Sequence, residues 1–154
     1  MKRVSHENAC CPVARPLDAI GDGWSLLIVR DAFDGLRRFG QFQKSLGVAK
    51  NILTARLNNL VGQGILETVP AEDGSAYREY VLTAKGRGLF PVLVALRQWS
   101  DEFAFGPDEP HYRMVDRETR QPLARLEIRA ADGRMLTPED TVVEMPPATG
   151  RHPG

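Results

Sequence analysis

The sequence predicts a mainly helical α+β fold in which one β-hairpin follows a series of short helices. Through the first two thirds of the chain, apolar residues recur at three- and four-residue steps, which is typical of amphipathic helices. Two short stretches with strand-like composition flank a turn, and glycines separate most of the periodic segments. The 154 residues suffice for one buried domain and a modest extension.

Two short helices are expected near the start of the chain. Helical periodicity indicates the first over residues 12–20 and the second from Trp24 to about Asp34. Gly21-Asp22-Gly23 lies between them and interrupts the pattern.

Two further helices follow, joined by a tight turn. The first, over residues 39–46, ends at Gly47, which suits a left-handed C-terminal cap. The second, from about Ala49 to Gln63, carries a leucine stripe at positions 53, 57 and 60 that should face the core. Two helices joined in this way form a helix-turn-helix.

A β-hairpin and a long helix complete this part. Strands are expected over residues 66–69 and 77–82, on either side of an acidic turn. Thr83 can cap a helix that runs to Phe103, and Pro91 inside it should produce a kink. The elements together predict a winged helix-turn-helix, in which the hairpin is the wing.

The chain should divide into three regions. Residues 1–106 hold the winged helix-turn-helix. Residues 107–145 are expected to form a small β-rich extension with strands over 112–116 and 123–129. Residues 146–154 are rich in proline and glycine and are expected to be disordered.

Composition argues against several functional classes. No apolar run approaches the roughly 20 residues that span a bilayer, and the N-terminus has no signal-peptide pattern, so we expect a cytoplasmic protein without a membrane partner. We find no metal-ligand spacing, phosphate-binding loop or nucleophile motif, and therefore expect no metal, no cofactor, no catalytic residue and no enzyme activity.

The charge pattern leaves nucleic-acid binding open. The chain has 20 Lys and Arg against 20 Asp and Glu, so its net charge attracts no polyanion. The segment from Arg37 to Arg56, however, contains five basic residues and no acidic one. The neutral total therefore does not exclude a local basic patch.

Several short motifs resemble the HxlR family of winged helix-turn-helix transcriptional regulators, within the MarR-like group. The resemblance covers Cys11 to Trp99 and rests on motif order and spacing. The motifs are Cys11-Pro12-Val13, Ile20-Gly21-Asp22-Gly23-Trp24, Arg38-Phe39-Gly40-Gln41-Phe42, Leu53-Thr54, Gly64-Ile65-Leu66, Glu79-Tyr80-Val81-Leu82-Thr83 and Pro91-Val92-Leu93.

This resemblance implies a homodimer that binds double-stranded DNA, with two recognition helices in successive major grooves. The chain departs from the family pattern at two positions. Ala49 stands where the family often has a serine, so the recognition helix lacks a side-chain cap, and Gly23 stands where lysine is common. By family analogy we expect repression rather than activation.

The outer face of the helix over residues 49–63 has the composition of a base-reading surface. Asparagine can pair with adenine, threonine can contact a thymine methyl, and lysine can meet guanine or phosphate. A merely solvated helix face is the alternative. The candidate base-facing residues are Lys50, Asn51, Thr54 and Asn58.

Basic residues around the turn and on the hairpin are candidate phosphate contacts, and ordinary surface solubility is their alternative role. Glu72 and Asp73 at the tip of the wing should repel phosphate, so the wing is expected to contribute little. The candidate phosphate contacts are Arg37, Arg38, Lys44, Arg56 and Arg78.

The last helix of the domain carries more apolar surface than one small domain covers, and dimerisation is the expected use for it. The family resemblance implies that the dimer is joined through the first and last helices. Aromatic residues such as Trp24 and Phe42 are read as core or interface rather than as an effector pocket. The candidate interface residues are Val13, Leu17, Leu89, Val92, Leu93, Leu96 and Trp99.

Cys11 precedes the first helix, where the helix dipole favours a thiolate. Redox sensing by Cys11, with Cys10 as resolving or intersubunit partner, is one hypothesis, and a small buried residue is the alternative. A small-molecule effector is likewise a hypothesis without an identity. The alternative to DNA binding as a whole is a winged helix that binds another protein.

Overall fold

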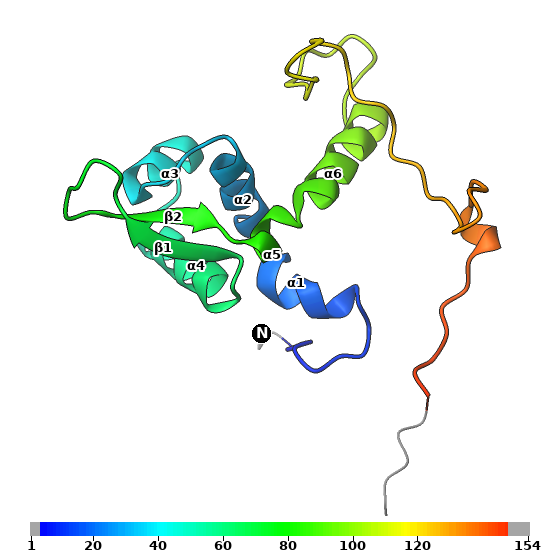
Figure 1. The fold of residues 1–154 in the computed structure, drawn as a ribbon, viewed down its shortest axis with the longest axis horizontal. Coiled ribbons are helices and arrows are strands. Elements are labelled where there is room, and N and C mark those ends of the chain that lie inside the picture. Colours follow the sequence, from blue (N-terminus) through cyan, green and yellow to red (C-terminus); the bar gives the residue numbers. More distant parts are fainter. Residues whose placement is uncertain (1–3, 148–154) are drawn as a thin grey trace, which may run out of the picture. The chain divides into compact units, whose positions relative to one another are not determined.

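The computed structural model describes residues 4–147 and contains helices and a two-stranded antiparallel sheet, as expected (Figure 1). Contacts divide the chain into two compact units, one ending at Leu96 and the other beginning at Arg97. No helix within the described residues is long and apolar enough to cross a membrane. The elements up to the end of the last long helix are α1 (Ala14–Ile20), α2 (Ser25–Phe33), α3 (Phe39–Leu46), α4 (Lys50–Gly62), β1 (Leu66–Pro70), β2 (Arg78–Leu82), α5 (Ala84–Arg87) and α6 (Phe90–Phe103).

The start of α2 depends on Asp22, which lies in the glycine-flanked turn after α1. One oxygen of its carboxylate accepts the backbone N–H groups of Trp24 and Ser25, each at 2.9 Å, and the other accepts the Ser25 hydroxyl. These bonds satisfy N–H groups that the first turn of a helix leaves without partners. The helix then buries Ile28 and Val29 completely.

The turn between α3 and α4 has the predicted geometry. Gly47 has a φ of 64°, and its N–H donates to the carbonyl of Gln43 at 2.8 Å, which confirms the left-handed cap. Ala49 precedes α4 and supplies no side-chain hydrogen bond to it, also as predicted. The chain thus enters α4 through an extended residue whose backbone alone begins the helix.

One apolar stripe fixes the rotation of α4. Leu53, Leu57 and Leu60 each have no exposed surface, which confirms the predicted inward face. Burying a leucine side chain stabilises a fold by about 1.5–3 kcal/mol. Rotating α4 about its axis would expose all three, so the core holds the opposite face of the helix toward solvent.

The hairpin formed by β1 and β2, which we call the wing, pairs Leu66 with Leu82 and Pro70 with Arg78. Leu66 is buried against the helices, whereas Gly74 turns the chain at the tip with a φ of 74°. The base of the hairpin, where Leu66 pairs with Leu82, thus belongs to the core, and the tip of the hairpin projects from the core.

The prediction of one long, kinked helix after Thr83 is wrong, because the chain forms two helices, α5 and α6, in its place. Thr83 does accept the N–H of Gly86 at 3.1 Å, which confirms the cap, but α5 ends after about one turn at Arg87. Pro91 is the second residue of α6. Proline is tolerated in a first turn because its missing N–H has no helical acceptor there. It therefore begins a helix rather than bending one.

The unit that begins at Arg97 contains the end of α6 and an irregular extension. The strands expected over residues 112–116 and 123–129 are reduced to isolated β-bridges, Val115 with Pro122 and Arg129 with Met135. A 3-10 turn, η1 (Pro138–Asp140), follows.

The physical reason is that the extension has no apolar face to bury. Leu126 and Ile128 are 48% and 66% exposed, so pairing of these segments covers little apolar surface. Local polar bonds shape the chain instead: the carboxylate of Asp116 accepts the N–H groups of Glu118 and Thr119, each at 2.8 Å. From residue 148 on, the tail expected to be disordered lies outside the described residues.

Candidate nucleic-acid interface

The face of α4 opposite the leucine stripe is polar and exposed. Lys50, Asn51, Thr54 and Asn58 all lie on it with exposed side chains, so the structure brings together the four residues expected to face bases. The hydroxyl of Thr54 donates to the carbonyl of Lys50 at 2.8 Å. Its methyl group is therefore the part that is available for contacts outside the helix.

Sequence reasoning overlooked Ile52 on the same helix. Its side chain is 39% exposed beside this polar face, although isoleucine usually lies in a core. The mismatch between an apolar residue and the predicted outer face was the signal that could have identified it. An exposed isoleucine can meet a thymine methyl, as threonine can.

Arg56 belongs to the inner half of α4 rather than to its exposed face. Its Nε lies 3.5 Å from the Asp22 carboxylate, which also begins α2. Burial alone would raise the pKa of Asp22. Hydrogen bonds from Ser25 and Trp24 and the charge of Arg56 lower this pKa by more, so the net shift is downward. Asp22 therefore stays charged, and Arg56 links α4 to the start of α2.

A buried carboxylate holds Arg37. Glu79 on β2 is 5% exposed and accepts the Nε–H of Arg37 at 2.5 Å and the backbone N–H of Glu72 at 3.1 Å. The N–H of Tyr80 donates to the carbonyl of Arg37 at 2.7 Å. Arg37 thereby joins the loop before α3 to the wing, and its guanidinium is committed within the domain.

Arg38 is paired with the tip of the wing. Its Nη2 lies 2.5 Å from the Asp73 carboxylate, and its guanidinium carbon lies 5.6 Å from the centre of the Tyr77 ring. Hydrogen bonds from Ser75, and then from Arg38, hold the pKa of Asp73 well below its usual range. The acidic wing tip, expected only to repel phosphate, thus also neutralises a neighbouring arginine.

The other two candidate phosphate contacts have no carboxylate partner among the described residues. Lys44 is exposed on α3, and Arg78 on β2 donates to the hydroxyl of Thr68 at 3.2 Å. A cavity of about 530 Å³ separates the start of α3 from the wing, and Arg38, Tyr77 and Arg78 line it. The uncommitted positive charge of this region therefore lies at Lys44, Arg78 and Lys50.

The candidate interface residues fall into two groups. Leu89 and Leu93 are partly buried and pack against the core, so they already have partners within one chain. The others are exposed to between 40% and 70%: Val13, Leu17, Val92, Leu96 and Trp99. This second group is one part of the apolar surface that the described residues expose.

Both cysteines are free and exposed, so the alternative of a small buried residue at Cys11 is wrong. The Sγ of Cys11 accepts the N–H of Ala14 at 3.4 Å. This bond, together with one from Val13, lowers the pKa of the Cys11 thiol, although the thiol is in contact with solvent. Within the described residues, no group of His, Cys, Asp and Glu side chains is placed to hold a metal ion.

Comparison with known proteins agrees with this geometry. Residues 19–106, which include the helix-turn-helix, the wing and α6, match the HxlR-like helix-turn-helix family. The chain belongs to this family. An uncharacterized HTH-type transcriptional regulator of Mycobacterium tuberculosis is 40% identical over 111 residues, which are 72% of this chain and 70% of that protein.

Solved structures extend the likeness. The crystal structure of PA1607, a candidate transcription factor, is similar over 92% of this chain and 99% of the other, with a TM-score of 0.87 and 64% identity. The redox regulator HypR in its oxidized form is similar over 59% of this chain and 95% of the other, with a TM-score of 0.54 and 30% identity. This HxlR-family chain is therefore a transcriptional regulator with a winged helix-turn-helix.

The two thiols should differ in reactivity. Because its pKa is lowered, the Cys11 thiol should react with iodoacetamide several times faster than Cys10 near neutral pH, and this difference should shrink as the pH rises. Peptide mass spectrometry of a time course on Cys10→Ser and Cys11→Ser variants measures each thiol alone. Equal rates across the pH range would contradict the contrast.

Proposed function

We propose that this regulator binds double-stranded DNA as a homodimer and acts as a repressor by occupying its operator. The observation that carries the proposal is the exposed polar face of α4, which the buried leucine stripe holds outward. A helix fits the major groove, and asparagine, threonine and lysine side chains suit base edges there. Such a regulator acts by binding rather than by catalysis, and in the cytoplasm.

The phosphate contacts of this proposal differ in strength. Lys44, Arg78 and Lys50 can meet phosphates directly. Arg38 must exchange Asp73 for a phosphate, and the cavity beside it leaves room for one. Arg37 and Arg56 are held by carboxylates that help to build the domain, so we assign them positioning roles in place of direct contacts. Phosphate contacts supply affinity without sequence information, so these charges would affect how tightly the protein binds DNA and not which sequence it binds.

The exposed group of Val13, Leu17, Val92, Leu96 and Trp99 supports the homodimer. Exposed apolar side chains that gather into one patch mark protein–protein interfaces, and a dimer that covers these five would remove their exposed apolar surface from water. Dimers of helix-turn-helix proteins bind two half-sites about one helical turn apart, and the second copy doubles the recognition surface.

Redox control through Cys11 and Cys10 is a second proposal. It is supported by the exposed, low-pKa thiol and by the likeness to a redox regulator. Hydrogen peroxide, together with one proton from solvent, would oxidise the Cys11 thiolate to a sulfenic acid and release water. A Cys10 thiol, of the same or the other protomer, would then form a disulfide and release a second water.

Replacing the base-facing asparagines should abolish specific DNA binding. Each bidentate asparagine–adenine pair contributes about 1–3 kcal/mol of discrimination, so Asn51→Ala with Asn58→Ala should weaken binding to the operator by a hundredfold or more. A mobility-shift assay with the DNA upstream of the protein's own gene, across a salt series, measures this. The matched control, Asn8→Ala, removes an exposed asparagine outside α4 and should bind as the wild type does.

If the folded dimer retards no fragment and shows no salt-dependent affinity, the DNA-binding proposal fails. The same fold would then be better explained as a module that binds another protein.

Removing the carboxylate at the wing tip should strengthen DNA binding. Asp73→Asn frees Arg38 for phosphate, and we expect affinity to rise about two- to fivefold at moderate salt. The slope of log K against log salt should steepen by about 0.9, the value for one further phosphate contact. Fluorescence anisotropy with an operator duplex measures both. Asp108→Asn is the charge-matched control, and an equal gain there would show that only net charge matters.

A charge on the exposed apolar group should dissociate the dimer. Leu96 is 47% exposed, and an unpaired glutamate at its position would be buried in the interface at a cost of several kcal/mol. Leu96→Glu should therefore raise the dimer dissociation constant by about a hundredfold, as measured by light scattering during size-exclusion chromatography. Val142→Glu, at an exposed residue of the extension, is the control, and a dimer that survives Leu96→Glu would refute this interface.

A further inference from the structure

A second cavity, separate from the α4 face, lies within the unit that ends at Leu96. Its volume is about 350 Å³, and α1, the residues just after α4, the start of α5 and the segment before α1 surround it. This volume falls in the lower part of the range of about 300–1,000 Å³ that is typical of small-molecule sites. The cavity is thus large enough for a compact ligand such as a single substituted ring.

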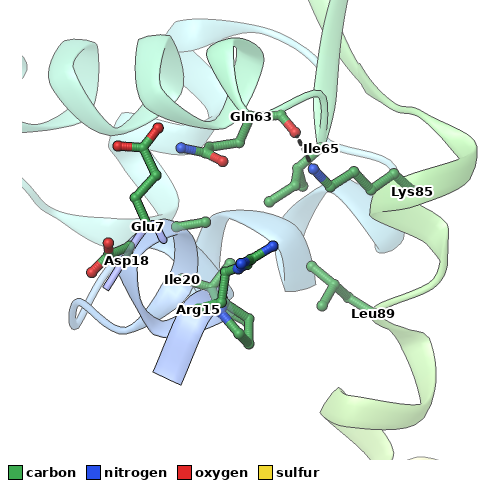
Figure 2. A pocket seen from close by; sticks show the side chains of 10 residues that line it. Glu7, Arg15, Asp18, Ile20, Gln63, Ile65, Lys85 and Leu89 are labelled. Carbon is green, nitrogen blue, oxygen red and sulfur yellow. Dashed lines mark hydrogen bonds between the residues drawn. The ribbon is translucent and has the colours of Figure 1, made fainter. Parts of the chain in front are cut away.

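The floor of this cavity is apolar, and two cations border it (Figure 2). Ile20 and Ile65 are buried there, and Leu89 packs beside them. The side chains of Arg15 on α1 and Lys85 on α5 point toward this apolar surface from two sides. An apolar floor with a small number of polar groups at its edge is the usual construction of a ligand site.

Both cations keep donors that the protein does not use. The Nε–H of Arg15 donates to the carbonyl of Ala9 at 3.0 Å, and no described residue accepts from its two Nη groups. The Nζ of Lys85 donates to the carbonyl of Gln63 at 2.6 Å, which leaves two of its three protons. Neither cation forms an ion pair with a described carboxylate, in contrast to Arg37, Arg38 and Arg56.

The position of Lys85 is built into the fold. Gly86, its neighbour on α5, is buried so closely that a Cβ there would lie 2.1 Å from the carbonyl oxygen of Ile65. Thr83 donates its N–H to that same carbonyl at 3.1 Å. Both contacts press the start of α5 against the floor of the cavity, so the stem of Lys85 leaves from a fixed point.

Two carboxylates line the other side of the cavity and restrict the charge of its ligand. Figure 2 shows Glu7 and Asp18 on one side and Lys85 on the other, with Arg15 between them. Asp18 accepts the hydroxyl of Ser5 at 3.0 Å and the N–H of His6 at 2.6 Å, and thereby ties the N-terminal segment to α1. A second negative charge on a ligand would meet these acids, so a monoanion fits better than a dianion.

From this arrangement we propose that the cavity binds a small organic monoanion, with its carboxylate between Arg15 and Lys85 and its apolar body on Ile20, Ile65 and Leu89. Arginine and lysine donate strong, charge-assisted hydrogen bonds to a carboxylate. The apolar body of the ligand would be removed from water by the floor, and this contributes affinity in proportion to the area covered.

Such a ligand would contact the end of the recognition helix. Gln63 is the C-cap residue of α4, and its carbonyl is the acceptor of the Lys85 bond. A cation beside the C-terminus of a helix stabilises it, since the last carbonyls carry partial negative charge. A carboxylate that drew Lys85 away would remove this support. The consequence for DNA binding rests on the function proposed above, whereas the binding site itself does not.

The site can be tested without DNA by titrating benzoate into the ¹⁵N-labelled full chain at constant ionic strength and recording amide spectra. We expect saturable shifts at Ile20, Ile65, Lys85 and Leu89. Benzamide, which has the same shape without the charge, and terephthalate, the dianion, should bind at least about tenfold more weakly.

Variants separate the proposed site from general anion binding. Arg15→Gln and Lys85→Gln should each weaken benzoate binding about tenfold, while Arg87→Gln, an exposed arginine on α5 outside the cavity, should leave it unchanged. The dispersion of the amide spectrum reports whether each variant is folded. If benzoate causes no saturable shifts at these residues, if benzamide binds as well, or if both cavity variants bind as the wild type does, the proposal is overturned.

DNA binding gives a separate readout. If benzoate changes the operator affinity of the wild type but not of Lys85→Gln, the cavity is coupled to α4. If benzoate binds but operator affinity is unaffected, the ligand site stands and its coupling to α4 is refuted.

Discussion

The burial of the leucine stripe on α4 is the constraint on which the candidate interface depends. Leu53, Leu57 and Leu60 have no exposed surface, and together they hold the helix in one rotation against the core. At about 1.5–3 kcal/mol for each leucine, exposing all three would cost an amount comparable to the whole stability of a small domain. The outward direction of Asn51 and Asn58 is therefore a consequence of packing on the opposite side.

Intramolecular ion pairs decide how much of the basic surface remains for a polyanion. The buried Glu79 uses Arg37 to fasten the wing to the loop before α3, and Asp22 uses Arg56 to connect α2 with α4. These two arginines therefore hold the helices and the hairpin in fixed relative positions. The same charges cannot also be free for phosphate, so these ion pairs reduce the basic surface that remains for a polyanion.

The wing of this chain is better described as a structural support for the domain than as a second DNA-recognition element. Its acidic tip pairs with Arg38, and Tyr77 lies beside the same guanidinium. A phosphate that approached Arg38 in the proposed DNA complex would compete with Asp73, and this competition involves none of the residues that we propose to face bases. The cavity bounded by Arg15 and Lys85 lies at the other end of α4, near its C-cap, where a ligand could act on the same helix by a different route.

Much of the fold could be predicted from the sequence because its signals are local. The leucine spacing of α4, the glycine that ends α3 and the threonine that caps α5 each act within a few residues of themselves. The same local signals gave a wrong expectation at Pro91. Apolar periodicity continues across residues 84–103 and predicts one helix, whereas the structure has a break between α5 and α6 just before Pro91. The strands predicted for the extension do not form, because segments with strand-like composition make a sheet only where one face of that sheet can be buried.

The helix-turn-helix, the wing and the polar face of α4 all follow from spacing along one segment, and they could therefore be predicted from the sequence. Which charges are available depends instead on contacts between distant segments. Arg37 and Glu79 are 42 positions apart, and Arg38 and Asp73 are 35 apart. No periodicity links such residues, and their pairing depends on the hairpin folding back over the loop before α3. The cavity between α1 and α5 has the same origin, since its apolar floor and its two cations come from segments that meet only when the core forms.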